Sequence, residues 1–129
     1  MPVASSEQVE QFEEQGYVFI EDAVQGAELQ RLQSAFDYWA GECKEEWLDQ
    51  VEKGDASPMW FDIPEPLEKD EIFIDMLDHP SYFPLLQTLS GGELLLAGIS
   101  VRMVPPWPLA YTGWHPDMER SAPLHPKLQ

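Results

Sequence analysis

The sequence predicts a domain of the α+β class, in which a mainly helical part, residues 1–92, precedes the first strands, within residues 93–129. Up to about residue 90, apolar residues recur at steps of three and four, as on the buried face of a helix. From residue 93 to residue 104 they form a nearly continuous run, which is typical of a strand. With 129 residues, 43% of them hydrophobic, the chain is long enough for one compact core.

The first elements are marked by signals at their ends. Ser5 or Ser6 can cap a short helix that Gly16 ends, and residues 17–20 then read as a strand. A longer helix opens at Gly26 and ends at Gly54, unless Gly41 divides it into two. Its apolar face recurs at helical spacing and comprises Leu29, Leu32, Phe36, Trp39, Cys43 and Trp47.

The remaining elements follow a proline-rich loop over residues 55–66. A helix carries Ile72 and Phe73, and another is expected to start at residues 78–80, with Asp78 as its cap and Pro80 in its first turn. Glycines 91 and 92 end that helix, residues 93–104 form a strand, and residues 105–108 break the strand. Trp60 and Phe61 in the loop can either line a pocket or complete the core.

Charge and composition exclude several classes of function. The net charge is -17, and residues 1–80 hold 21 of the 24 acidic residues, so nucleic acid and acidic membranes are not expected partners. Cys43 is the single cysteine, which excludes an internal disulfide and a cysteine zinc cluster and favours a small core residue. The N-terminus lacks the pattern of a signal peptide, and we expect a cytoplasmic protein without a membrane span.

The stretch Trp114-His115-Pro116-Asp117 carries the most specific chemical signal. An imidazole and a carboxylate one residue apart supply two ligands of the two-His-one-carboxylate site that binds non-haem Fe(II). The alternative is an exposed histidine in an Asx-type turn, which short His-x-Asp sequences often form.

Three stretches together resemble the phytanoyl-CoA dioxygenase family of Fe(II)- and 2-oxoglutarate-dependent oxygenases. Residues 12–22, with Leu29 and Leu32, are similar to its opening helix, strand and second helix. Residues 79–92 are similar to the helix before its first long strand. Residues 101–106 and then 114–117 resemble that strand, the proline break and the His-x-Asp metal motif. The order and spacing of the three stretches cover nearly the whole chain.

The resemblance implies a double-stranded β-helix, a cupin-like jelly roll with helices packed outside. It implies an enzyme that hydroxylates a small organic molecule with O2 and 2-oxoglutarate, with ascorbate as an auxiliary reductant. In that scheme His115 and Asp117 bind Fe(II), and Arg102 and Thr112 are candidates to bind the cosubstrate. The aromatic residues beside the motif can wall a substrate pocket or complete the core: Trp107, Tyr111 and Trp114. Arg102 has an alternative role, pairing with a structural acid.

The family's distal histidine and its basic residue for 2-oxoglutarate would lie beyond Gln129. His125 lies only ten residues after His115, too close for the distal ligand, and is expected in a loop. We therefore expect the chain to be the N-terminal portion of one such domain, with an unpaired strand edge that favours self-association. The competing hypothesis is a non-catalytic acidic domain that acts through contacts with other proteins.

Overall fold

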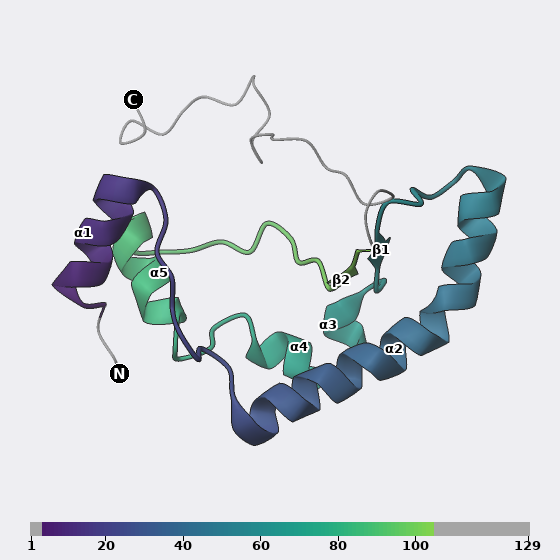
Figure 1. Cartoon of the computed structure of the whole chain (residues 1–129), viewed down its shortest axis with the longest axis horizontal. Helices are drawn as coiled ribbons and strands as arrows, with labels where there is room; N and C mark the ends of the chain where they lie inside the picture. Colours follow the sequence, from purple (N-terminus) through teal and green to yellow (C-terminus); the bar gives the residue numbers. More distant parts are fainter. Residues whose placement is uncertain (1–3, 105–129) are drawn as a thin grey trace.

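The computed structural model describes residues 4–104, which form five helices and a two-stranded antiparallel sheet (Figure 1). The predicted α+β class is confirmed for this part of the chain, with the helices before residue 92 as expected. Among the described residues, no helix has the length and apolar character needed to cross a bilayer.

Helix α1 (Ser6–Gln15) has the ends that the sequence predicts. The Ser5 hydroxyl accepts a hydrogen bond from the Gln8 backbone N–H at 3.2 Å, and the Gln8 side chain accepts one from the Ser5 N–H at 3.0 Å. This capping box satisfies two backbone donors that a helix start otherwise leaves unpaired. Gly16 ends the helix with φ 78°, a conformation that costs glycine little.

Helix α2 (Gly26–Lys53) is one uninterrupted helix, so the alternative of a break at Gly41 is wrong. Gly54 ends it in the left-handed conformation, as predicted. The predicted apolar face does turn inward: Leu32, Phe36, Trp39, Cys43 and Trp47 are partly buried against the core. The most buried residues of this helix are nevertheless two alanines, Ala35 and Ala40.

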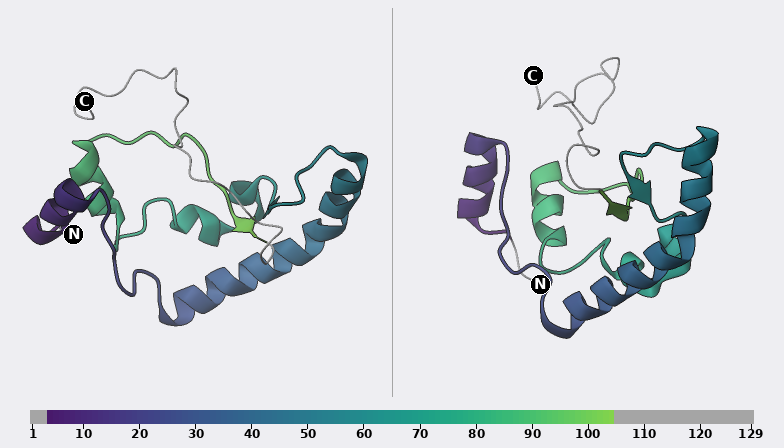
Figure 2. Two further views of the ribbon diagram at one scale, coloured as in Figure 1. Left: turned by 45° about the horizontal axis from the view of Figure 1, so that its top comes forward. Right: turned by 45° about the vertical axis from the view of Figure 1, so that its right-hand side comes forward.

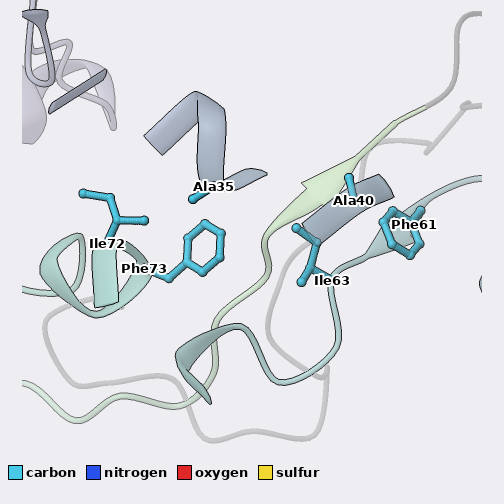
Figure 3. Packing of buried hydrophobic residues seen from close by; sticks show 6 residues of the cluster. All are labelled: Ala35, Ala40, Phe61, Ile63, Ile72 and Phe73. Carbon is cyan, nitrogen blue, oxygen red and sulfur yellow. The ribbon is translucent and has the colours of Figure 1, made fainter. Parts of the chain in front are cut away.

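The core lies where α2 meets the sheet and helix α4 (Glu71–Asp75). Ile72 and Phe73 of α4 lie beside Ala35, and Phe61 and Ile63 lie near Ala40 (Figure 3). These four large side chains are at most 2% exposed. The small alanine side chains let α4 and the sheet come close to the α2 backbone.

The sheet pairs strand β1 (Phe61–Asp62) with strand β2 (Arg102–Met103). Phe61 lies opposite Met103 and Asp62 opposite Arg102. The sequence predicted a loop where β1 lies, so β1 corrects that part of the prediction, whereas the core position of Phe61 is one of the two predicted alternatives. β1 ends because Glu65 adopts φ 48° and the chain turns into the short helix α3 (Pro66–Lys69).

The strand predicted over residues 93–104 is confirmed only in part, because regular pairing covers Arg102 and Met103. Residues 93–101 cross from α5 to β2 as an extended chain (Figure 1). Among the described residues this stretch has one β-type backbone bond, from the Ile63 N–H to the Val101 carbonyl at 2.9 Å. The strand predicted over residues 17–20 is wrong: no described segment pairs with it, and Tyr17 and Phe19 are 60% and 72% exposed.

Helix α5 (Phe83–Ser90) begins later than predicted, with Tyr82 as its cap residue and Pro84 in its first turn. Residues 79–82 form a turn instead, held by His79, whose carbonyl accepts bonds from the N–H groups of Tyr82 and Phe83. The predicted end at Gly91 is confirmed. Helices α1 and α5 lie side by side in both views of Figure 2, at the opposite end of the molecule from the sheet.

Phe73 and Ile74 are neighbours on α4 that differ in burial, with exposed fractions of 1% and 46%. Replacing Phe73 with alanine leaves a cavity beside Ala35, so we expect a loss of about 3–5 kcal/mol in the free energy of unfolding. The matched change Ile74→Ala removes an exposed side chain and should cost no more than about 0.5 kcal/mol. Urea denaturation measures both, and equal losses would contradict this description of the core.

Candidate functional site

Arg102 is the only predicted site residue within residues 4–104. The predicted metal ligands His115 and Asp117 and the cosubstrate candidate Thr112 lie outside the described residues, as do the pocket residues Trp107, Tyr111 and Trp114. The structure therefore shows the surroundings of Arg102 and the helices and strands that precede the predicted metal motif.

Arg102 is held by an acidic residue on the neighbouring strand. Its Nε donates to one carboxylate oxygen of Asp62 at 2.8 Å, and one of its terminal nitrogens donates to the other at 2.7 Å. The antiparallel register sets the two residues directly opposite each other. Such a two-pronged pair fixes the plane of the guanidinium. The hydrogen bonds to Asp62 raise the pKa of Arg102, and partial burial opposes the rise.

Trp60 adds a second constraint, because the guanidinium carbon of Arg102 lies 5.0 Å from the centre of its ring. The sequence left open whether Trp60 and Phe61 line a pocket or complete the core. Phe61 is buried and completes the core, while Trp60 is half-buried. For Arg102, the structure shows the predicted pairing with a structural acid. A role in binding 2-oxoglutarate stays a prediction.

An open groove of about 740 Å³ runs beside the chain that leads into β2. Its wall on that side is formed by residues 99–102, and its remaining lining is mostly apolar. The residues come from α2 and from α4 with its C-terminal cap: Leu32, Gln33, Phe36, Asp37, Phe73 and Met76. A volume of this size lies within the range of small-molecule sites, but it is also what a missing layer of side chains would leave.

The described part of the chain does not bring together a set of metal ligands. Within residues 4–104 no three side chains among His, Cys, Asp and Glu come together in a way that could hold an ion.

A buried histidine forms the second polar cluster. Nε2 of His79 lies 2.9 Å from a carboxylate oxygen of Glu28, at the start of α2, and Nδ1 lies 2.6 Å from the Ser81 hydroxyl. The His79 side chain is only 9% exposed. The sequence predicted no more than a residue at a helix start, since 51 positions separate the two partners and no local pattern connects them.

The arrangement of acid, histidine and serine is a structural tie rather than a catalytic triad. The Ser81 hydroxyl lies two residues from His79 in the same turn, and its backbone N–H also points to Nδ1, at 3.3 Å. The imidazole is buried, with its side chain only 9% exposed, so a substrate has little access to it. The cluster joins the first turn of α2 to the turn before α5.

Tyr82 packs on this cluster, with its ring stacked on His79 at 5.4 Å between centroids and its hydroxyl donating to the Met76 carbonyl. Burial is the main cause that raises the pKa of the Tyr82 phenol, and the negative charges of Glu28 and Asp78 add to it. The neutral phenol is therefore the form that the folded state favours.

Comparison with known proteins gives no relative from which to read a function: no family model, curated protein or solved structure matches this chain.

The pair of Arg102 and Asp62 should contribute modestly to stability because both side chains are more than a third exposed, at 41% and 36%. In a double-mutant cycle with Arg102→Gln and Asp62→Asn, we expect a coupling of about 0.5–1 kcal/mol that shrinks in 1 M salt. Arg102→Lys keeps the charge but loses the two-pronged geometry and should retain only part of that coupling. Urea denaturation measures the cycle, and a coupling of zero would argue against a structural role.

Tyr82 should make the fold sensitive to alkaline pH. Its pKa is higher in the folded than in the unfolded state, so its contribution to stability is complete below the ordinary phenol pKa of about 10. That contribution is lost as the pH rises through the folded-state value, because the unfolded chain then releases the proton more readily. Tyr82→Phe should remove this alkaline loss, and the latest phase of phenolate absorbance should vanish with it. Unchanged titration curves in the variant would refute the assignment.

Proposed function

We propose that residues 1–129 form the N-terminal portion of an Fe(II)- and 2-oxoglutarate-dependent oxygenase domain of the phytanoyl-CoA dioxygenase type, which hydroxylates a small organic molecule. One observation carries the proposal: the order and spacing of three stretches, residues 12–22, 79–92 and 101–117. Each stretch alone is short, and their succession over nearly the whole chain gives them weight.

The order of the described elements supports this proposal. Residues 12–22 contain the end of α1 and the chain that leads toward α2, and residues 79–92 contain the turn at His79 and all of α5. The third stretch begins on β2, the last described strand, which is followed directly by the proline break. Most of the described helices precede β2, which is consistent with outer helices that come before the core strands.

In the proposed enzyme, bound iron together with 2-oxoglutarate supplies the oxidising chemistry, and the protein binds and orients the reactants. His115 contributes a neutral imidazole nitrogen and Asp117 an ionised oxygen, since both groups must be unprotonated to bind a metal. We assign Arg102 mainly the structural role, because Asp62 accepts two hydrogen bonds from its guanidinium and so fixes its position on the strand.

A second candidate function is a non-catalytic acidic domain that binds other proteins. Several large apolar side chains of the described residues favour it because they are exposed to solvent, among them the neighbours Leu95 at 96% and Leu96 at 58%. Adjacent exposed leucines of this kind are typical of surfaces that another polypeptide covers. The two candidates differ in what they require of residues 114–117, since only the oxygenase needs a metal there.

Fe(II) titration under anaerobic conditions separates the two candidates. Replacing either His115 or Asp117 with alanine removes a direct ligand, so we expect each change to weaken Fe(II) binding at least about tenfold. His125→Ala is the matched control and should bind Fe(II) as the unaltered chain does. Asp117→Gly should also lose affinity and leave a position that a halide could occupy.

Unaltered binding in the His115 and Asp117 variants would overturn the oxygenase proposal. Equal loss in the His115 and His125 variants would point instead to a compact local site built from both histidines. In a protein that also contains the distal ligands, succinate release from 2-oxoglutarate provides the activity readout, and both alanine changes at residues 115 and 117 should abolish it.

A further inference from the structure

The two edges of β2 differ in their hydrogen bonding. In the antiparallel register, the Ile63 N–H donates to the Val101 carbonyl, and Met103 lies opposite Phe61. Backbone groups in such a ladder point alternately to one side and the other. The backbone N–H and C=O groups of residues 101 and 103 therefore point toward β1. Those of residues 100, 102 and 104 point to the opposite edge of β2. Among residues 4–104 no strand pairs with that edge.

The same segment has an inner and an outer face. Ile99, Val101 and Met103 are partly buried, and Val101 and Met103 pack against the core. The residues between them, including Arg102, are exposed. This alternation is that of a half-buried strand, although only two of its residues are regularly paired. A strand added at the open edge would thus continue a sheet whose inner face is already defined.

The groove of about 740 Å³ lies beside this segment and over the N-terminal half of α2. Trp47, near the other end of α2, packs on Phe61 of β1, with ring centroids 5.4 Å apart. From Trp47 back to Leu32 the helix runs for about 22 Å at 1.5 Å per residue. Two neighbouring strands span only about 5 Å between their axes. Leu32, Phe36, Phe73 and Met76 line this groove, and within residues 4–104 the sheet has no third strand that could lie over them.

We propose that, in the second candidate function, a protein that binds other proteins, the edge of β2 that is unpaired within residues 4–104 and the adjacent groove bind an extended strand of another polypeptide. That strand has apolar side chains at alternate positions, which enter the groove, and a basic side chain next to Asp37. Its backbone supplies the hydrogen bonds that the edge lacks, and its apolar side chains complete the layer between α2 and α4. This mode of binding, β-strand addition, takes affinity from the main chain and specificity from the pockets.

Charge determines the chemistry of the partner. Within the described residues Asp37 forms no salt bridge, while the positive charge of Arg102 is matched by Asp62. The groove thus carries one uncompensated negative charge, and the whole chain has a net charge of -17. A lysine or arginine on the bound strand would face favourable potential, whereas an acidic strand would be repelled.

A second copy of this chain fits the site less well. Two copies would bring together two net charges of -17. If two copies paired through their β2 edges, each copy would also bring its own α2, which lies under the inner face of β2 where Val101 and Met103 pack. Both α2 helices extend past their own β2, so the two helices would compete for the space under the joined strands. A strand that brings no helix of its own avoids this conflict.

The test uses the full chain and a labelled synthetic peptide of about seven residues, a common strand length. The peptide alternates valine with threonine and carries lysine at both ends. Two control peptides keep this pattern: one replaces lysine with glutamate, and the other carries N-methyl groups that remove its backbone donors. Fluorescence anisotropy at low salt should show binding of the lysine peptide, with at least about tenfold weaker binding of either control.

Two pairs of protein variants locate the site. Ser100→Pro removes an N–H from the open edge, so we expect peptide binding to weaken about fivefold to tenfold. Ser100→Ala keeps the N–H and should bind as the unaltered chain does. Asp37→Lys should weaken binding of the lysine peptide and strengthen binding of the glutamate peptide, a reversal that misfolding cannot produce. Circular dichroism checks that each variant keeps its helices.

Several outcomes would overturn the proposal. They are failure of the lysine peptide to bind, equal binding of all three peptides, and equal affinity of the Ser100→Pro and Ser100→Ala proteins. Dimerisation without peptide that Ser100→Pro abolishes would assign the edge to a second copy, as the sequence had suggested. The result does not depend on iron, so Fe(II) titration and peptide binding can fail independently of each other.

Discussion

The packing of α2 against everything else is the interaction on which the described structure depends. Its 28 residues contribute Ala35 and Ala40 to the centre of the core and carry the partly buried stripe from Leu32 to Trp47. Phe61 of β1 and Ile63 just after it, together with Ile72 and Phe73 of α4, are at most 2% exposed, and all four pack near α2. Loss of this contact would expose the buried side chains of the sheet region and of α4 to water.

Two polar ties complete the arrangement, and each connects segments that are distant in sequence. Glu28 and His79 join the start of α2 to the turn before α5, and Asp62 and Arg102 join the two strands. In the first pair His79 is buried and its hydrogen bonds are costly to lose, although Glu28 is 42% exposed, while in the second pair both partners are partly exposed and the pair is weakened by water. Both pairs consist of side chains that often act in catalysis. In both, the contacts are better explained by a role in stabilising the fold.

Both candidate functions require that a further strand cover the surface beside β2. An oxygenase domain of the double-stranded β-helix type would cover the open edge and the groove with further strands of its own polypeptide. An acidic interaction domain would cover them with a strand from a partner. In either case the apolar lining of the groove and the edge of residues 99–104, which is unpaired within the described part of the chain, have one explanation, because a strand laid there satisfies the backbone and fills the groove at once. What separates the two is the chemistry of His115 and Asp117.

The sequence by itself determined the features that depend on a few neighbouring residues. The cap at Ser5, the helix ends at Gly16, Gly54 and Gly91, and the inward stripe of α2 were all predicted correctly, because capping and helical periodicity are local. Of the candidate site, it predicted that Arg102 could pair with an acid, but not which one. The His-x-Asp motif and the family resemblance remain predictions from sequence, since residues 105–129 lie outside the described part.

Only the tertiary structure decided which segments meet. It paired Phe61 with Met103 across 42 positions, left residues 17–20 without a described partner strand, and moved the start of α5 from residues 78–80 to Phe83 by engaging His79 with Glu28. It also made Ala35 and Ala40 the closest contacts of α2, although larger side chains dominate the apolar pattern. The reason is that strand pairing and close packing depend on which surfaces approach each other in space, and local propensity carries no information about that approach.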